Sequence, residues 1–187
     1  MVFRRRSSTP PDPLAAVDPE AVPPSYRAPV ADALRARTQF GALVAGLRDG
    51  PLQDRMRELG AHVDAGVLAV WRTASQAAEI DRVAATLDPD RVTSELKQAR
   101  RAGAADDVVT ALQQRFASTQ RLLNSRDELR DRLPVLEARL GTAVARAAEL
   151  ALTSPAAAAT EIAGLEGELD RLVVELDALG AATTELG

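Results

Sequence analysis

The sequence predicts an all-α protein: an elongated helical bundle with a C-terminal antiparallel coiled-coil hairpin and a disordered N-terminal tail. Three observations lead to this fold class. Prolines cluster in the first 28 residues, and apolar residues recur at helical spacing through almost all of the remaining chain. In the last third of the chain, two leucine repeats lie on either side of a predicted turn, and the spacing of one is the reverse of the other. We therefore expect a tail over residues 1–28 and one helical domain over residues 29–187.

The tail prediction rests on proline. Proline lacks an amide donor and biases the preceding residue away from helix, so a dense group of prolines is typical of a flexible segment. The prolines of this segment are Pro10, Pro11, Pro13, Pro19, Pro23 and Pro24.

The basic group Arg4, Arg5 and Arg6 is the one unusual feature of the tail. Three interpretations of it stay open. It could be a solvated segment, it could contact anionic lipid or a partner protein, or it could direct a kinase to Ser7 or Ser8. Three clustered charges would bind a membrane surface only weakly.

Glycine and proline separate the first predicted helices. We expect helices over about residues 30–48, 51–87 and 89–101. Gly50 and Pro51 divide the first two, and Asp88 followed by Pro89 is typical of an N-cap and a first helical position. Gly103 is expected to end the third helix, because glycine readily adopts the left-handed conformation that follows many helices.

A long helix is expected over about residues 105–153, and a last one over about residues 155–180. Two features could interrupt the long helix. The run from Ser125 to Glu128 matches a capping box that would restart a helix, and Pro134 removes a backbone hydrogen bond. Because the apolar repeat continues through both, we favour one kinked helix over a true break.

The last two predicted helices carry apolar seams that match in an antiparallel hairpin. Within each helix the apolar residues alternate at steps of three and four, the spacing of a coiled coil. Facing residues of an antiparallel pair have numbers with a constant sum, and these seams meet that condition. The facing pairs are Leu129 with Leu176, Leu133 with Leu172, Leu136 with Leu169, Leu140 with Leu165 and Ala143 with Ile162.

Charged residues beside the seams favour the same pairing. The three flanking pairs of opposite charge are Arg132 with Glu175, Arg139 with Glu168 and Arg146 with Glu161. Pairing of the last helix with its own copy would instead set glutamate against glutamate, so we expect it to fold back on the preceding helix. On the other side Glu137 approaches Glu166, which suggests that the helix over residues 51–87 covers that side and supplies Arg55 or Arg57.

The composition excludes many chemistries. The 187 residues include no cysteine and a single histidine, His62, so thiolate chemistry is excluded and a metal site is disfavoured. The net charge of −4 disfavours generic nucleic-acid binding, and the aromatic content of 3% makes a small-molecule pocket less expected. The sequence contains no run of 18 apolar residues, which is about the length that a membrane-spanning helix needs. We expect no cofactor and no metal.

The function that these features favour is a non-catalytic scaffold or adaptor that binds an unidentified partner protein through a helical face. The alternative is a peripheral protein that contacts anionic lipid through Arg4, Arg5 and Arg6. An enzyme would need a polar cluster that the sequence does not reveal. We expect a cytoplasmic protein, with a peripheral position at the inner face of the membrane as the alternative, and the sequence does not determine its oligomeric state.

Overall fold

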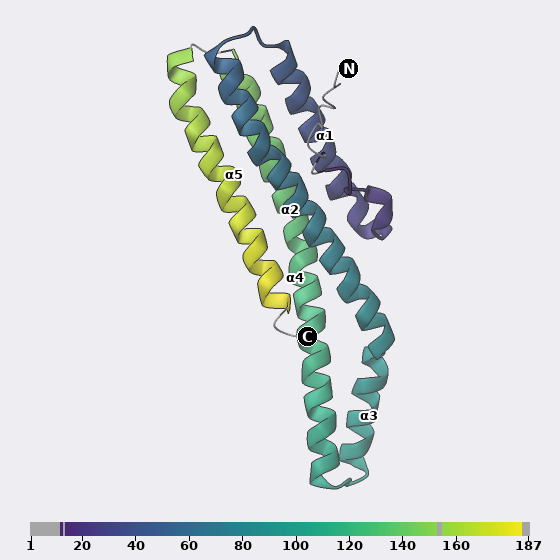
Figure 1. Cartoon of the computed structure of the whole chain (residues 1–187). Coiled ribbons are helices and arrows are strands. Elements are labelled where there is room, and N and C mark those ends of the chain that lie inside the picture. Colours follow the sequence, from purple (N-terminus) through teal and green to yellow (C-terminus); the bar gives the residue numbers. More distant parts are fainter. Residues whose placement is uncertain (1–11, 13, 153–154, 185–187) are drawn as a thin grey trace, which may run out of the picture.

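All regular secondary structure in the described part of the chain is helical, as predicted. A computed structural model describes residues 12, 14–152 and 155–184, and within them it contains no strand (Figure 1). A short 3-10 helix, η1 (Pro19–Ala21), precedes five α-helices. These are α1 (Pro24–Gly46), α2 (Pro51–Leu87), α3 (Pro89–Arg101), α4 (Asp106–Leu150) and α5 (Pro155–Thr184).

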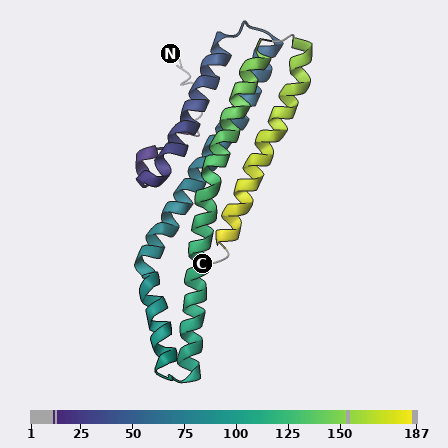
Figure 2. The same cartoon turned by 180° about the vertical axis from the view of Figure 1, so that it is seen from behind.

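The helices α2 and α4 lie side by side, with α1 against both on one flank and α5 against both on the other. Among the described residues, α1 makes no contact with α5. Figures 1 and 2 show that α3 continues the course of α2 beyond the end of α5 and pairs there with the first part of α4. The molecule therefore has a body of four helices and an arm of two.

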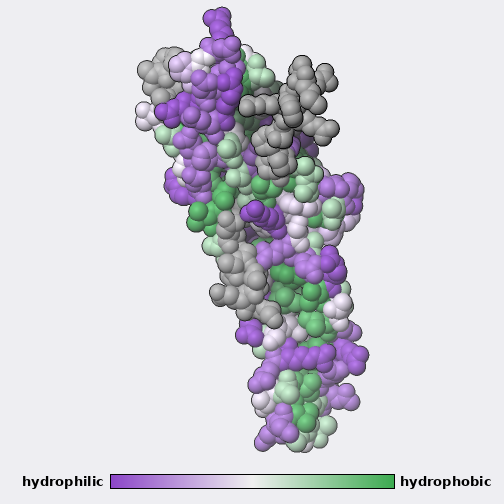
Figure 3. Space-filling view, viewed as in Figure 1, coloured by the Kyte–Doolittle hydropathy of each residue, from purple (hydrophilic) through white to green (hydrophobic). Residues whose placement is uncertain are grey.

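The arm has apolar side chains at its surface because no third helix covers it. Figure 3 shows apolar surface among polar residues along this part of the molecule. Leu96 of α3 is buried, whereas Val108 at the start of α4 is 48% exposed. Two helices alone bury only the strip of residues between them.

The start of α1 differs from the prediction. The helix begins at Pro24, about six residues earlier than expected, and Leu14, Val22 and Tyr26 are buried in the core. The second half of the expected tail is therefore part of the folded domain, while residues 1–11 and 13 lie outside the described residues. Proline at the first helical position costs no hydrogen bond, and burial of these apolar groups offsets the constraint that Pro29 imposes inside the helix.

A polar connection links α1, α2 and α4. The Tyr26 hydroxyl donates a hydrogen bond to Asp81 Oδ2 at 2.6 Å. Arg126 Nη1 lies 3.7 Å from Asp81 Oδ1, so the carboxylate of α2 meets a phenol of α1 and a guanidinium of α4. Burial, together with the bond to Asp81, raises the pKa of Tyr26 from 10.0 to about 12.

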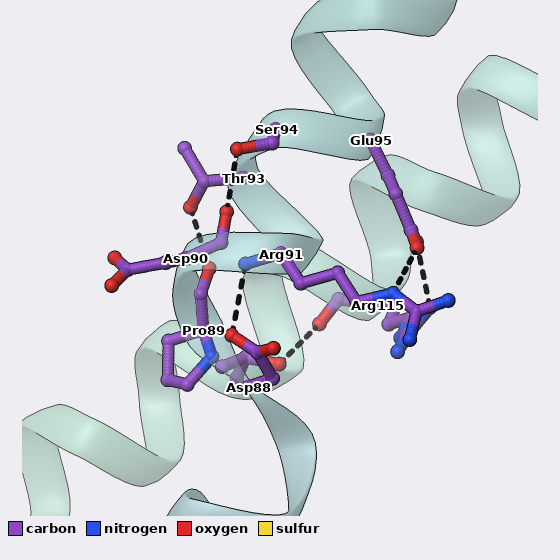
Figure 4. A network of polar contacts seen from close by, with 9 residues as sticks. Asp88, Pro89, Asp90, Arg91, Thr93, Ser94, Glu95 and Arg115 are labelled. Carbon is purple, nitrogen blue, oxygen red and sulfur yellow. Dashed lines mark hydrogen bonds and ion pairs between the residues drawn. The ribbon is translucent and has the colours of Figure 1, made fainter.

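Asp88 connects α2 to α3, and its backbone is left-handed, with φ of 47° and ψ of 77°. Its Oδ1 accepts a hydrogen bond from the amide of Arg91 at 3.1 Å, which confirms the predicted N-cap (Figure 4). Glu95, one turn later, bonds both Arg91 of α3 and Arg115 of α4, at 2.7 and 3.1 Å (Figure 4). Asp88 thus starts the arm, and Glu95 ties its two helices together. Gly103, with φ of 65°, follows the end of α3 as predicted.

The helix α4 runs without a break through Ser125 and Pro134, so its predicted continuity is confirmed. It ends at Leu150, three residues before the predicted end, and α5 extends to Thr184, beyond the predicted residue 180.

The predicted seam residues are buried, but α2 shares the seam. Every described seam leucine of α4 and α5 is buried: Leu129, Leu133, Leu136, Leu140, Ile162, Leu165, Leu169 and Leu172. The side chain of Leu176 lies outside the described residues. On α2 the buried residues include Gly66, Ala69 and Thr73, whose small side chains permit a close approach of the neighbouring helices. A Cβ atom on Gly66 would lie 3.1 Å from Leu140 Cδ1, so this contact requires glycine or a shift of the leucine.

The burial of Leu14 predicts that the segment before α1 contributes to stability. Leu14 is 5% exposed, and Leu14→Ala should lower the free energy of unfolding by roughly 2–5 kcal/mol if the cavity does not collapse. Leu152→Ala is the matched control, because Leu152 is 89% exposed and its truncation should change little. Urea unfolding followed by circular dichroism measures both. Equal stability of the two variants would show that Leu14 does not pack in solution.

The raised pKa of Tyr26 predicts a specific loss of stability in alkali. Below pH 10 the phenol is protonated in both the folded and the unfolded chain, so its contribution is fully present. Between pH 10 and about 12 the unfolded chain loses this proton first, and the stability contributed by the group falls through that window. Comparison with Tyr26→Phe isolates the effect, since the variant should lack this part of the pH dependence.

The chain contains one tyrosine, so its ionisation can be read directly from the ultraviolet absorbance of the native protein. We expect a midpoint near 12 in the folded protein and near 10 in denaturant. A native midpoint near 10 would contradict the buried hydrogen bond to Asp81.

Candidate functional site

The flanking charge pairs of α4 and α5 are in part those predicted. Arg132 Nη1 donates to Glu175 Oε1 at 3.1 Å, as the sequence indicated. The structure corrects the other two pairs. Arg139 Nη1 donates to Glu175 at 2.8 Å rather than to Glu168, and Arg146 Nη1 donates to Glu168 at 2.9 Å rather than to Glu161. Both arginines reach an acid one heptad farther along α5 than expected.

The position of α5 accounts for this shift. The sequence prediction considered only α4 and α5, but α5 also packs against α2. His62 of α2 and Asp170 of α5 join the same two helices, with 2.7 Å between Nδ1 and Oδ1. The helix α2 contacts both α4 and α5, but Arg55 and Arg57, which were expected to face Glu137 and Glu166, bond within α2. Arg55 pairs with Glu58 and Arg57 with Asp54, all on α2.

A groove lies between α4 and α5, which lie side by side with α2 behind them in Figure 2. It has a volume of about 760 Å³. Its lining comes from both helices: Pro134, Val135, Ala138, Arg139, Thr142 and Ala143 of α4, and Glu168, Leu169, Arg171, Leu172 and Glu175 of α5. We call this the α4–α5 groove.

The α4–α5 groove has both apolar and charged lining residues. Leu169 and Leu172 of α5 are buried, whereas Val135 of α4 is 49% exposed and Ala138 is also exposed. Arg139 of α4 and Glu175 of α5 form an ion pair that joins the two helices. Amphipathic helices bind in apolar grooves of this kind.

A second depression continues the groove toward the turn between the helices. It has a volume of about 500 Å³ and shares Glu168 with the first. Its lining is Arg146, Glu149, Leu150, Glu161, Gly164, Leu165 and Glu168. Three carboxylates and one guanidinium therefore surround this end, which we call the acidic end of the groove.

A further depression of about 690 Å³ lies between α1 and α2. Phe40 and Gly60 line it, and Arg37 at its edge binds Asp64 at 2.9 Å. Arg37 also lies 3.4 Å from Asp12. The charges there are paired with each other, so this depression offers a partner less unpaired charge than the acidic end of the α4–α5 groove.

The other sequence candidates do not assemble into a site. Arg4, Arg5 and Arg6 lie outside the described residues. Within the described ranges no group of three or more acidic or histidine side chains is arranged to hold a metal ion. No helix there combines the length and the apolar character that crossing a bilayer requires.

The α4–α5 groove itself was not predicted. The matching of the two seams suggested that they close on each other, and the sequence carries no direct signal for the space that α5 leaves when it settles against α2. A usable hint was the uncharged run on one side of α4 formed by Pro134, Val135, Ala138 and Thr142.

Comparison with protein-family models, with curated proteins and with solved structures finds no match to this chain.

Proposed function

We propose that the protein is a non-catalytic helical scaffold or adaptor that binds a helix of a partner protein in the α4–α5 groove. The observation that carries this proposal is the exposed, uncharged side of α4 that lines the groove together with buried leucines of α5. Partner helices that insert an apolar stripe into such a channel replace water on both surfaces.

The dimensions of the groove support a helical occupant. From Pro134 to Glu149 the wall follows α4 for about 22 Å, at 1.5 Å per residue, which is about four helical turns. A helix of that length presents apolar side chains at about four successive turns. In this proposal α4 and α5 act as a coiled-coil hairpin, α2 fills one side of their seam, and the partner fills the other.

Charge at Ala138 should abolish this interaction. Ala138→Glu would place a carboxylate on the apolar wall, where a bound helix would have to desolvate it, so the affinity for the partner should fall at least about tenfold. Ala145→Glu is the matched control, because Ala145 is exposed on the same helix and does not line the groove. Both variants should retain the helical circular dichroism of the original chain.

Affinity purification from the native host with the three proteins, followed by calorimetry on the purified partner, measures the effect. The expected result is a partner that binds the original chain and Ala145→Glu but not Ala138→Glu. A partner that binds all three equally would place the interaction elsewhere and contradict the groove as the binding surface.

A further inference from the structure

The acidic end of the α4–α5 groove has charges that the protein itself leaves unbalanced. Arg146 places its Nη1 at 2.9 and 3.0 Å from the two carboxylate oxygens of Glu168, so this arginine is already engaged. Glu149 and Glu161 line the same depression, and neither has an ion-pair partner among the described residues. Both are exposed, which leaves them available to an incoming side chain.

Glu149 is also in an unfavourable position relative to the dipole of α4. It lies in the last turn of α4, which ends at Leu150 and contains no basic residue. The C-terminal turn of a helix carries partial negative charge on its free carbonyl groups, so an acid there is unfavourable and a cation is favourable. Glu161 lies beyond the first turn of α5, where the opposite partial charge at the helix start has largely faded.

The other end of the groove carries an excess of positive charge. Glu175 there accepts hydrogen bonds from both Arg132 and Arg139. Arg171, which also lines the groove, adds a further positive charge, and its Nε donates to the carbonyl of Gly167. The groove is therefore polarised along its length, with negative charge concentrated near the turn between α4 and α5.

We propose that the helix bound in the α4–α5 groove carries arginine or lysine at the end that lies beside Glu149 and Glu161. This inference rests on the proposed function and adds the class and the orientation of the partner. The carboxylates are not arranged to share one metal ion, since the described residues hold no such group. They suit instead the separate cationic side chains of one helical turn, and charge complementarity of this kind fixes the register and orientation of a bound helix.

Two synthetic peptides of equal length, with the same leucine stripe at helical spacing, test the inference. One carries three arginines in its last turn, and the other carries three glutamates at those positions. Fluorescence anisotropy with the full chain should show the basic peptide binding at least about tenfold more tightly, with a ratio that falls as salt rises. Ala138→Glu should weaken both peptides, because it blocks the apolar wall that they share.

Charge variants separate the acidic end from the net charge of the protein. The double variant Glu149→Gln, Glu161→Gln should reduce the preference for the basic peptide to about twofold or less. The control Glu20→Gln, Glu79→Gln removes the same number of charges from exposed positions outside the groove and should keep the preference.

The outcomes distinguish this inference from the function on which it rests. If both peptides bind equally and both are lost with Ala138→Glu, the groove binds helices but the charge inference is wrong. If the control pair removes the preference as fully as the groove pair, the preference comes from overall charge and the inference is again wrong. If neither peptide binds, the groove is not a helix-binding surface and the proposed function fails as well.

Discussion

The packing of α2 against both α4 and α5 determines most of what is distinctive in this structure. Gly66 of α2 is buried and has no side chain, so Leu140 of α4 approaches it closely. The apolar seam of α5 is then buried against two helices rather than one. The position of α5 relative to α4 follows from this packing, and so do the choice of acid that each flanking arginine reaches and the groove that stays open between α4 and α5.

The helix boundaries could be predicted from sequence wherever a local signal sets them. Asp88 before Pro89 and Gly103 marked the ends of α3, since capping and left-handed backbone are decided by a few neighbouring residues. The start of α1 was missed for the opposite reason. Prolines argued for a tail, while the deciding term was burial of Leu14, Val22 and Tyr26 against helices distant in sequence.

The pairing of α4 with α5 was likewise predicted in part, where the two helices alone decide it, and missed where a third helix takes part. The direction of the pair and the contact of Arg132 with Glu175 followed from a two-helix argument. The partners of Arg139 and Arg146 did not, because α5 packs on α2 as well as on α4 and a pairwise count contains no term for a third helix. The α4–α5 groove could not be predicted from the pairing of the two seams. A groove is a space that side chains leave unfilled, and no single residue in the sequence indicates it.

The unbroken course of α4 has a geometric consequence. An α-helix rises 1.5 Å per residue, so the path along α4 from Asp106 at the arm tip to Pro134 at the edge of the groove is about 42 Å. The break at Asp88 divides the opposite side of the molecule into the two helices α2 and α3, but α4 runs beside both of them. A single continuous backbone therefore sets the separation between the groove and the far end of the arm.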